Sequence, residues 1–143
     1  MPLALTFADG GLKTVIYDTN SETVAALRQG QMPFMEIGAQ DMLVRTLRNG
    51  MLELSDTPAL LGECEFLVMI IGTPVDQHLN PSFNAIHRAI NSCSSHLRNG
   101  QTLILRSTVF PGITHQVQRQ LAGMGLKISV AFCPERVAQG PAW

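Results

Sequence analysis

The sequence has little net charge and no long apolar run. Lys and Arg number 10 against 11 Asp and Glu, a formal net charge of −1 over 143 residues. Nothing in this balance favours binding to nucleic acid or to an anionic membrane. No apolar stretch approaches the roughly 18 residues that a membrane-spanning helix needs, and the first residues carry no basic segment typical of a secretory signal. These absences favour a globular domain without a membrane or nucleic-acid partner.

Cysteine is also scarce. The three cysteines are widely spaced and form no Cys-x-x-Cys pair, which suits reduced thiols better than a disulfide framework, so we expect a cytoplasmic protein. They are Cys64, Cys93 and Cys133. The four histidines have no metal-ligand spacing with each other or with cysteine, so we expect no metal site. No Gly-x-Ser-x-Gly elbow is found either.

What is present is an alternation of short apolar runs with segments of helical periodicity. Six consecutive apolar residues at 66–71 favour a strand covered on both faces of a sheet. The alternation predicts an α/β fold with a doubly wound, Rossmann-like parallel sheet. The expected strands lie at 13–17, 51–54, 66–71, 102–105 and 127–132. The expected helices lie at 3–11, 21–29, 39–48, 82 or 84 to 96, and 113–123, with a short helix or turn at 56–62.

A strand and a phosphate-cradling glycine loop are missing before the first helix. The only early glycine pair, Gly10-Gly11, ends a helix rather than opening one. In the doubly wound order 3-2-1-4-5-6, strands 13–17 and 66–71 would flank this absent first strand. Each buried backbone group that lacks a hydrogen-bond partner costs about 1–3 kcal/mol. We therefore expect the gap between these two strands to be filled. The two strands could pair directly, another subunit could supply a strand, or residues outside this sequence could do so.

Asp18 follows the strand at 13–17 directly. In a dinucleotide-binding fold an acid at this place accepts hydrogen bonds from the adenosine ribose hydroxyls. Such an acid disfavours a 2′-phosphate, so NAD is expected rather than NADP. The alternative is an aspartate that only forms a turn or a cap, and the local pattern leaves both interpretations open.

Three further loops follow apolar strands, at the edge of the sheet where ligands bind in open α/β folds. Gly72-Thr73-Pro74 could approach a cofactor closely, or could be only a tight turn that stops the strand. Ser107-Thr108 could face a ligand, or could cap the helix that follows Pro111-Gly112. Glu135-Arg136 could form only a surface pair, but an acid–base carboxylate and an anion clamp at this edge are the favoured interpretation.

Taken together, these motifs resemble the UDP-glucose/GDP-mannose dehydrogenases, a family of nucleotide-sugar 6-dehydrogenases, over the family's amino-terminal NAD-binding domain. Four motifs occur in the family's order and spacing. They are Pro2-Leu3-Ala4 followed by a helix, Val15-Ile16-Tyr17-Asp18, Ile71-Gly72-Thr73-Pro74 and Ser107-Thr108-Val109-Phe110-Pro111-Gly112. The resemblance is narrowed further by a motif near the end of the sequence, Pro134-Glu135-Arg136. This motif is typical of the branch that acts on N-acetylated sugars, so the chain most resembles the UDP-N-acetyl-D-mannosamine dehydrogenases.

The resemblance implies a role for each matching residue. Asp18 would hold the adenosine ribose, and Thr73 and Thr108 would contact NAD within loops that also contribute Gly72, Pro74 and Ser107. Thr108 would also help to hold a catalytic water. Glu135 would lie near the nicotinamide as an acid–base group and cofactor contact, with Arg136 and Val137 lining the sugar site. The family oxidises the sugar C6 alcohol to a carboxylate in two NAD-dependent steps through a cysteine-bound intermediate.

By the same resemblance, residues 1–143 form a partial NAD-binding domain, without the family's central helices and carboxyl-terminal domain. None of the three cysteines has the family's nucleophile setting, so we expect no turnover by this chain alone. We expect a UDP-sugar as the substrate of the full-length family and a homo-oligomer as the assembly. The alternative is a non-catalytic Rossmann-type binding or assembly module.

Overall fold

The computed structural model describes residues 1–71 and 84–135. The predicted site residues Gly72, Thr73, Pro74, Arg136 and Val137 lie outside the described residues. The chain divides into two compact units, Met1–Leu60 and Leu61–Trp143. Each unit is an α/β arrangement with its own hydrophobic core.

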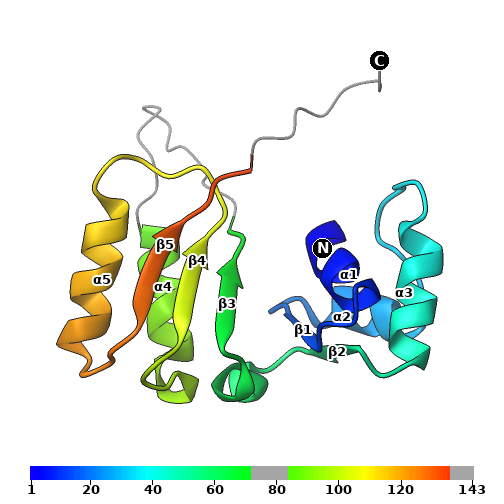
Figure 1. Cartoon of the computed structure of the whole chain (residues 1–143), viewed down its shortest axis with the longest axis horizontal. Coiled ribbons are helices and arrows are strands. Elements are labelled where there is room, and N and C mark those ends of the chain that lie inside the picture. The colour runs from blue at the N-terminus through cyan, green and yellow to red at the C-terminus, as the bar shows by residue number, and fades with distance from the viewer. Residues whose placement is uncertain (72–83, 136–143) are drawn as a thin grey trace. The chain divides into compact units, whose positions relative to one another are not determined.

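The first unit places three helices around a two-stranded parallel sheet (Figure 1). Strands β1 (Thr14–Tyr17) and β2 (Leu52–Ser55) pair in register, with Thr14 opposite Leu52 and Tyr17 opposite Ser55. The core gathers fully buried side chains from every helix, including Leu5, Leu27 and Leu43. The elements are α1 (Pro2–Asp9), β1 (Thr14–Tyr17), α2 (Ser21–Arg28), α3 (Ala39–Arg48) and β2 (Leu52–Ser55).

Local sequence explains where these helices begin and which face they bury. The side chain of Asn20 accepts hydrogen bonds from the backbone N–H groups of Glu22 and Thr23, so it satisfies two donors that the first turn of α2 leaves open. In α3 the buried positions are Ala39, Leu43 and Thr46, which fall on one face at helical spacing. The sequence predicted the bounds of α3 correctly.

In its described residues, the second unit is a three-stranded parallel sheet with two α-helices (Figure 1). The strand order is β3 (Phe66–Met69), β4 (Thr102–Leu105) and β5 (Ser129–Phe132), with Phe66 opposite Thr102 and Thr102 opposite Ser129. Both helices contribute to one core, in which Ile90 and Leu121 pack with Leu103. The elements are β3 (Phe66–Met69), α4 (Asn84–Cys93), β4 (Thr102–Leu105), α5 (Ile113–Gly123) and β5 (Ser129–Phe132), with 3-10 helices at Pro58–Glu63 and Ser94–His96.

The strand at 66–71 is shorter than predicted and is not covered on both faces. It ends as a strand at Met69, and its burial alternates: Leu67 is 9% exposed, whereas Phe66 is 59% and Val68 is 37% exposed. The two helices of this unit pack on the Leu67 face, because Leu67 and not its neighbours belongs to their core cluster. An unbroken apolar run therefore overestimated the cover on this strand, since burial also depends on which elements pack against each face.

Each unit has its own sheet among the described strands: β1 pairs with β2 in the first unit, and β3 pairs with β4 in the second. The direct pairing of strands 13–17 and 66–71, one of three expected ways to fill the gap, stays a prediction, because the two strands belong to different units. The orders β1-β2 and β3-β4-β5 do agree with the two halves of a doubly wound sheet. Supply of a strand by another subunit or by further residues stays a prediction.

One buried polar side chain organises the amino ends of the strands in the second unit. Gln101 is 1% exposed, and its amide nitrogen donates to the carbonyl oxygens of Leu61 at 2.7 Å and Cys64 at 2.6 Å. Its amide oxygen accepts from the backbone N–H of Arg98 at 2.8 Å. These bonds fasten the turns that lead into β3 and β4, so buried Gln101 is a structural residue that the sequence analysis missed.

None of the helices in residues 1–71 and 84–135 has both the length and the apolar character required to span a bilayer.

Candidate functional site

Asp18 lies directly after β1, at the carboxyl end of the strand. Its backbone N–H donates to the carbonyl oxygen of Ser55 at 3.1 Å, which continues the β1–β2 ladder. Its carboxylate atom Oδ1 accepts from the backbone N–H of Asn20 at 2.9 Å. The other carboxylate oxygen makes no hydrogen bond with any described residue. Asp18 therefore does form a turn, and it keeps one oxygen with which it can accept a hydrogen bond from a ligand.

The surroundings of Asp18 include the amino group of Met1. Burial lowers the pKa of this amino group, while the negative charges of Glu36 and Asp18 act in the opposite direction. Asp18 is half-buried, so its carboxylate is partly shielded from water.

Ser107 connects two adjacent strand ends. Its hydroxyl accepts a hydrogen bond from the backbone N–H of Ile71 at 2.9 Å, and it thus fixes the main chain just before the predicted Gly72-Thr73-Pro74 loop. Helix α5 begins only at Ile113, after Gly112, and has no side-chain cap. The alternative in which Ser107 or Thr108 caps this helix is therefore wrong.

The loop that contains Ser107 ends at Gly112, and Thr108 within this loop is exposed. Gly112 has a φ of 92°, a left-handed conformation that favours glycine. A Cβ atom at this position would meet nothing within 4 Å, so the requirement is conformational. The hydroxyl of Thr108 makes no hydrogen bond within the described part of the chain. Thr108, unlike Ser107, can offer its hydroxyl to a ligand.

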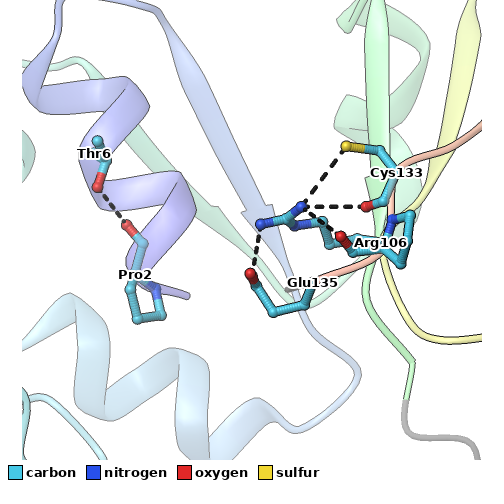
Figure 2. A network of polar contacts seen from close by, with 6 residues as sticks. Pro2, Thr6, Arg106, Cys133 and Glu135 are labelled. Carbon is cyan, nitrogen blue, oxygen red and sulfur yellow. Dashed lines mark hydrogen bonds and ion pairs between the residues drawn. The ribbon is translucent and has the colours of Figure 1, made fainter. Parts of the chain in front are cut away.

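Arg106 binds the segment that follows β5 at three successive residues (Figure 2). Its Nη1 donates to the carbonyl oxygens of Cys133 at 3.2 Å and Pro134 at 3.3 Å. Its Nη2 donates to Oε2 of Glu135 at 2.6 Å, an ion pair between side chains that are 20% and 50% exposed. The backbone N–H of Glu135 also donates to the carbonyl oxygen of Arg106 at 3.0 Å. Glu135 is thus held by both its backbone and its side chain.

Arg106 is not among the site residues predicted from the sequence, although the sequence contains a signal for its role. Arg106 follows β4 directly, and β4 pairs in register with β5, so Leu105 lies opposite Phe132. A cation just after one strand and an anion just after its neighbour indicate an ion pair across the strand ends. The predicted Glu135–Arg136 pair differs from this one, and Arg136 lies outside the described residues.

The structure brings Ser107, Thr108 and Glu135 to one edge of the second unit, at the carboxyl ends of β4 and β5. Asp18 lies at the corresponding end of β1 in the first unit. Its approach to the other three is a prediction. A wide hollow of about 770 Å³ in the second unit, next to Lys127 and Ser129, contains none of the predicted residues. It lies at the amino end of β5, and so it does not coincide with the candidate site.

Parallel strands joined by helices, with polar loops at their carboxyl ends, define the class: a Rossmann-like nucleotide-binding fold. Residues 1–143 match the family described as the UDP-glucose/GDP-mannose dehydrogenase family, NAD binding domain. The chain therefore belongs to this family and corresponds to its NAD-binding domain. The family and the cofactor predicted from the sequence are confirmed.

Individual relatives agree with this assignment. The UDP-N-acetyl-D-glucosamine 6-dehydrogenase of Pseudomonas aeruginosa is 29% identical over 98% of this chain and 33% of its own length. The UDP-N-acetyl-D-mannosamine dehydrogenase of Pyrococcus horikoshii is 28% identical over 98% of this chain and 34% of its own length. The chain thus spans about a third of the curated relatives it matches.

Solved structures show the same fold. The UDP-D-ManNAc dehydrogenase of Pyrococcus horikoshii matches with a TM-score of 0.89 and 29% identity, over 96% of this chain and 34% of that chain. A UDP-glucose dehydrogenase of Pyrobaculum islandicum matches with a TM-score of 0.86 and 28% identity, over the same two shares. The α/β fold with parallel strands is therefore confirmed.

Proposed function

We propose that this chain is the NAD-binding part of a dehydrogenase that oxidises the C6 alcohol of an N-acetylated UDP-sugar to the carboxylate, with UDP-N-acetyl-D-mannosamine as the substrate. Family membership over residues 1–143 supports the reaction class. The observation that carries the proposal is the carboxylate oxygen of Asp18 that makes no hydrogen bond with a described residue. It lies at the carboxyl end of β1, where a dinucleotide fold needs an acceptor for the ribose.

The described residues fit NAD. Asp18 would accept from the adenosine ribose hydroxyls, and Thr108 would contact the cofactor through its exposed hydroxyl and help to hold a catalytic water. Ser107 would act by fixing the main chain beside Gly72, Thr73 and Pro74, which we also place at the cofactor. NAD, when bound, supplies the acceptor for the hydride that leaves the sugar carbon.

Glu135 is the acid–base group of the proposal. A carboxylate at the end of β5 can exchange a proton with a sugar hydroxyl or with water, provided that it reaches them in the bound complex. We place Glu135 beside the nicotinamide and place Arg136 and Val137 on the sugar.

The substrate choice rests on the Pro134-Glu135-Arg136 motif together with the relatives' names. Relatives named as UDP-N-acetyl-D-mannosamine dehydrogenases occur in several organisms, and one is named as a UDP-N-acetyl-D-glucosamine 6-dehydrogenase. Both names share an N-acetylated UDP-sugar. Initial rates of NAD reduction should therefore be compared among UDP-N-acetylmannosamine, UDP-N-acetylglucosamine and UDP-glucose. A preference for UDP-glucose would contradict the N-acetylated class.

We propose catalytic turnover only for a longer protein, which also contains regions that the relatives have in addition to the part matched by these 143 residues. None of Cys64, Cys93 and Cys133 is assigned as the nucleophile, and the chain spans about a third of its relatives. Rates should therefore be measured on the longest form of the protein in which this chain occurs. Its assembly as a homo-oligomer is part of the proposal, and light scattering tests it.

The direct test of cofactor binding is calorimetric titration of NAD and NADP into the chain and into Asp18→Asn. We expect weak NAD binding by the chain, NADP binding that is weaker still, and a further loss of about tenfold or more for NAD in the variant, because a hydrogen bond to a charged group is lost. Asp41→Asn, the same change at an exposed residue of α3, should leave the affinity unchanged.

Two outcomes would contradict the proposal. Equal NAD affinity for Asp18→Asn and the unaltered chain would remove the ribose role of Asp18. Failure of every form of the protein to bind NAD, with a stable oligomer retained, would favour a non-catalytic assembly module instead.

A further inference from the structure

The two residues that follow the central strand of the second unit hold the ends of both neighbouring strands. On one side, the backbone N–H of Arg106 donates to Met69 at 3.0 Å, and the hydroxyl of Ser107 accepts from Ile71 at 2.9 Å. On the other side, the Arg106 guanidinium and carbonyl oxygen bind the segment that ends at Glu135. The dipeptide therefore aligns the main chain on both sides of β4, at the edge where the site is proposed.

We propose that Arg106 is a positioning residue for Glu135, the proposed acid–base group. It acts by fixing both the carboxylate and the main chain of residues 133–135. This inference rests on the proposed function only in the role that it gives to Glu135. The fixing itself is a property of the fold.

The guanidinium is matched to this task by its shape. Arg106 donates to two carbonyl oxygens and one carboxylate oxygen, and its Nη1 also lies 3.7 Å from Sγ of Cys133. A planar fork with several fixed donors can serve all of these acceptors at once, whereas the single ammonium of a lysine cannot reach them in one geometry. Charge alone does not account for the contacts with the two carbonyl oxygens.

Stability alone explains this arrangement poorly. Ion pairs with one partner half exposed contribute little to the free energy of folding. In addition, the Nε atom of Arg106 is buried without a hydrogen-bond partner among the described residues, which counts against stability. A cation that is held at such a cost and directed at one carboxylate is better explained by the orientation it imposes.

Hydrogen exchange of backbone amides tests the fixing without any need for catalysis. In Arg106→Gln we expect the amide of Glu135 to exchange at least tenfold faster, because the guanidinium no longer holds residues 133–135. The amide of Leu103, inside β4, should keep its protection and so report that the unit remains folded. Arg119→Gln makes the same chemical change at an exposed position of α5 and should alter neither amide.

Kinetics on the longest form of the protein test the consequence for the reaction. A misplaced catalytic group costs about 10- to 100-fold in rate, so Arg106→Gln should lower kcat by this factor and leave the KM for NAD within about twofold. Arg106→Lys should recover only part of kcat. Full recovery by lysine would show that charge suffices and would overturn the positioning role. If Arg106→Gln does not fold, hydrogen exchange at the Glu135 amide and kcat are measured on Arg106→Lys instead, and these two results test the positioning role.

The two proposals fail separately. Unchanged exchange at Glu135 in Arg106→Gln would overturn the positioning role, whatever the activity of the protein. Faster exchange at Glu135 in a protein that never oxidises a UDP-sugar would support the fixing by Arg106 and count against the proposed function.

Discussion

The two acidic residues proposed for the site are held in different ways, one by a local contact and the other by a long-range contact. Asp18 is fixed by the backbone of Asn20, only 2 residues further along the chain. Glu135 is fixed by Arg106, which lies 29 residues earlier, across two strand ends. The first acid depends on a turn that any chain with this local sequence can form. The second depends on β4 and β5 lying side by side in the correct register.

This difference matches what each acid is proposed to do. An acceptor for ribose hydroxyls tolerates small displacements, because hydroxyl groups rotate to meet it. A group that moves a proton must be placed much more accurately relative to the reacting atoms. The long-range support therefore occurs at the residue with the more demanding proposed role.

Substitutions in the two hydrophobic cores should have the largest effect on stability. They also separate the local support of Asp18 from the long-range support of Glu135. Leu121→Ala in the second unit and Leu43→Ala in the first each remove a fully buried leucine and should lower the free energy of unfolding by about 2–5 kcal/mol. Leu121→Ala should speed exchange at the Glu135 amide but not at Asn20, whereas Leu43→Ala should do the reverse. Denaturant titration and hydrogen exchange measure both effects.

The control for this pair is Leu12→Ala. Leu12 is 60% exposed, so its loss should change the free energy of unfolding by less than about 0.5 kcal/mol. If Leu121→Ala affected the amides of Asn20 and Glu135 equally, the two supports would not be independent.

Gln101→Met should lower the free energy of unfolding slightly less than the two core substitutions do. It keeps the length of the side chain but removes its hydrogen bonds with the carbonyl oxygens of Leu61 and Cys64 and with the N–H of Arg98. With a penalty of about 1–3 kcal/mol for each lost hydrogen bond and partial rescue by water, we expect the free energy of unfolding to fall by about 2–4 kcal/mol in denaturant titration. Gln116→Met, at an exposed position of α5, should be close to neutral.

Asn20→Ala tests the local support. It removes the side-chain cap of α2 and should lower the free energy of unfolding by about 1 kcal/mol. Because Oδ1 of Asp18 bonds the backbone of residue 20, the turn itself should survive, and NAD affinity should change less than in Asp18→Asn. Asn20→Ser should restore most of the stability, and a larger loss of NAD affinity than in Asp18→Asn would contradict this ranking.

The smallest effect is expected at the ion pair between α1 and α3. The hydrogen bond and charge of Arg45 lower the pKa of Asp9 below its ordinary value of 3.8. A carboxyl with a lowered pKa stabilises the fold above its unfolded pKa and loses this contribution as the pH falls through its folded value. The small stability difference between the unaltered chain and Arg45→Gln should therefore shrink as the pH drops well below 3.8.

Denaturant titrations at several pH values measure this difference. Arg48→Gln, a neighbouring exposed arginine of α3, should show no such dependence on pH. A difference that grew on acidification would contradict the assigned direction of the Asp9 pKa.

Local patterns in the sequence were sufficient for most of the elements and for the family. The bounds of Ala39–Arg48, Thr102–Leu105 and Ile113–Gly123 agree with the sequence prediction, because apolar spacing and flanking glycines act over a few residues. The four motifs that carried the resemblance are likewise short, contiguous stretches. They identified the family correctly although identity to individual relatives is below 30%.

Only the tertiary structure decided which residues meet. The apolar run at 66–71 gave no sign that Phe66 would be 59% exposed, and no local pattern indicated that Gln101 would be buried or that Ser107 would bind Ile71. The partner of Glu135 depends on the pairing of β4 with β5. Contacts between residues about 30 positions apart are set by how whole elements pack, and this packing is a property that a short window of sequence does not contain.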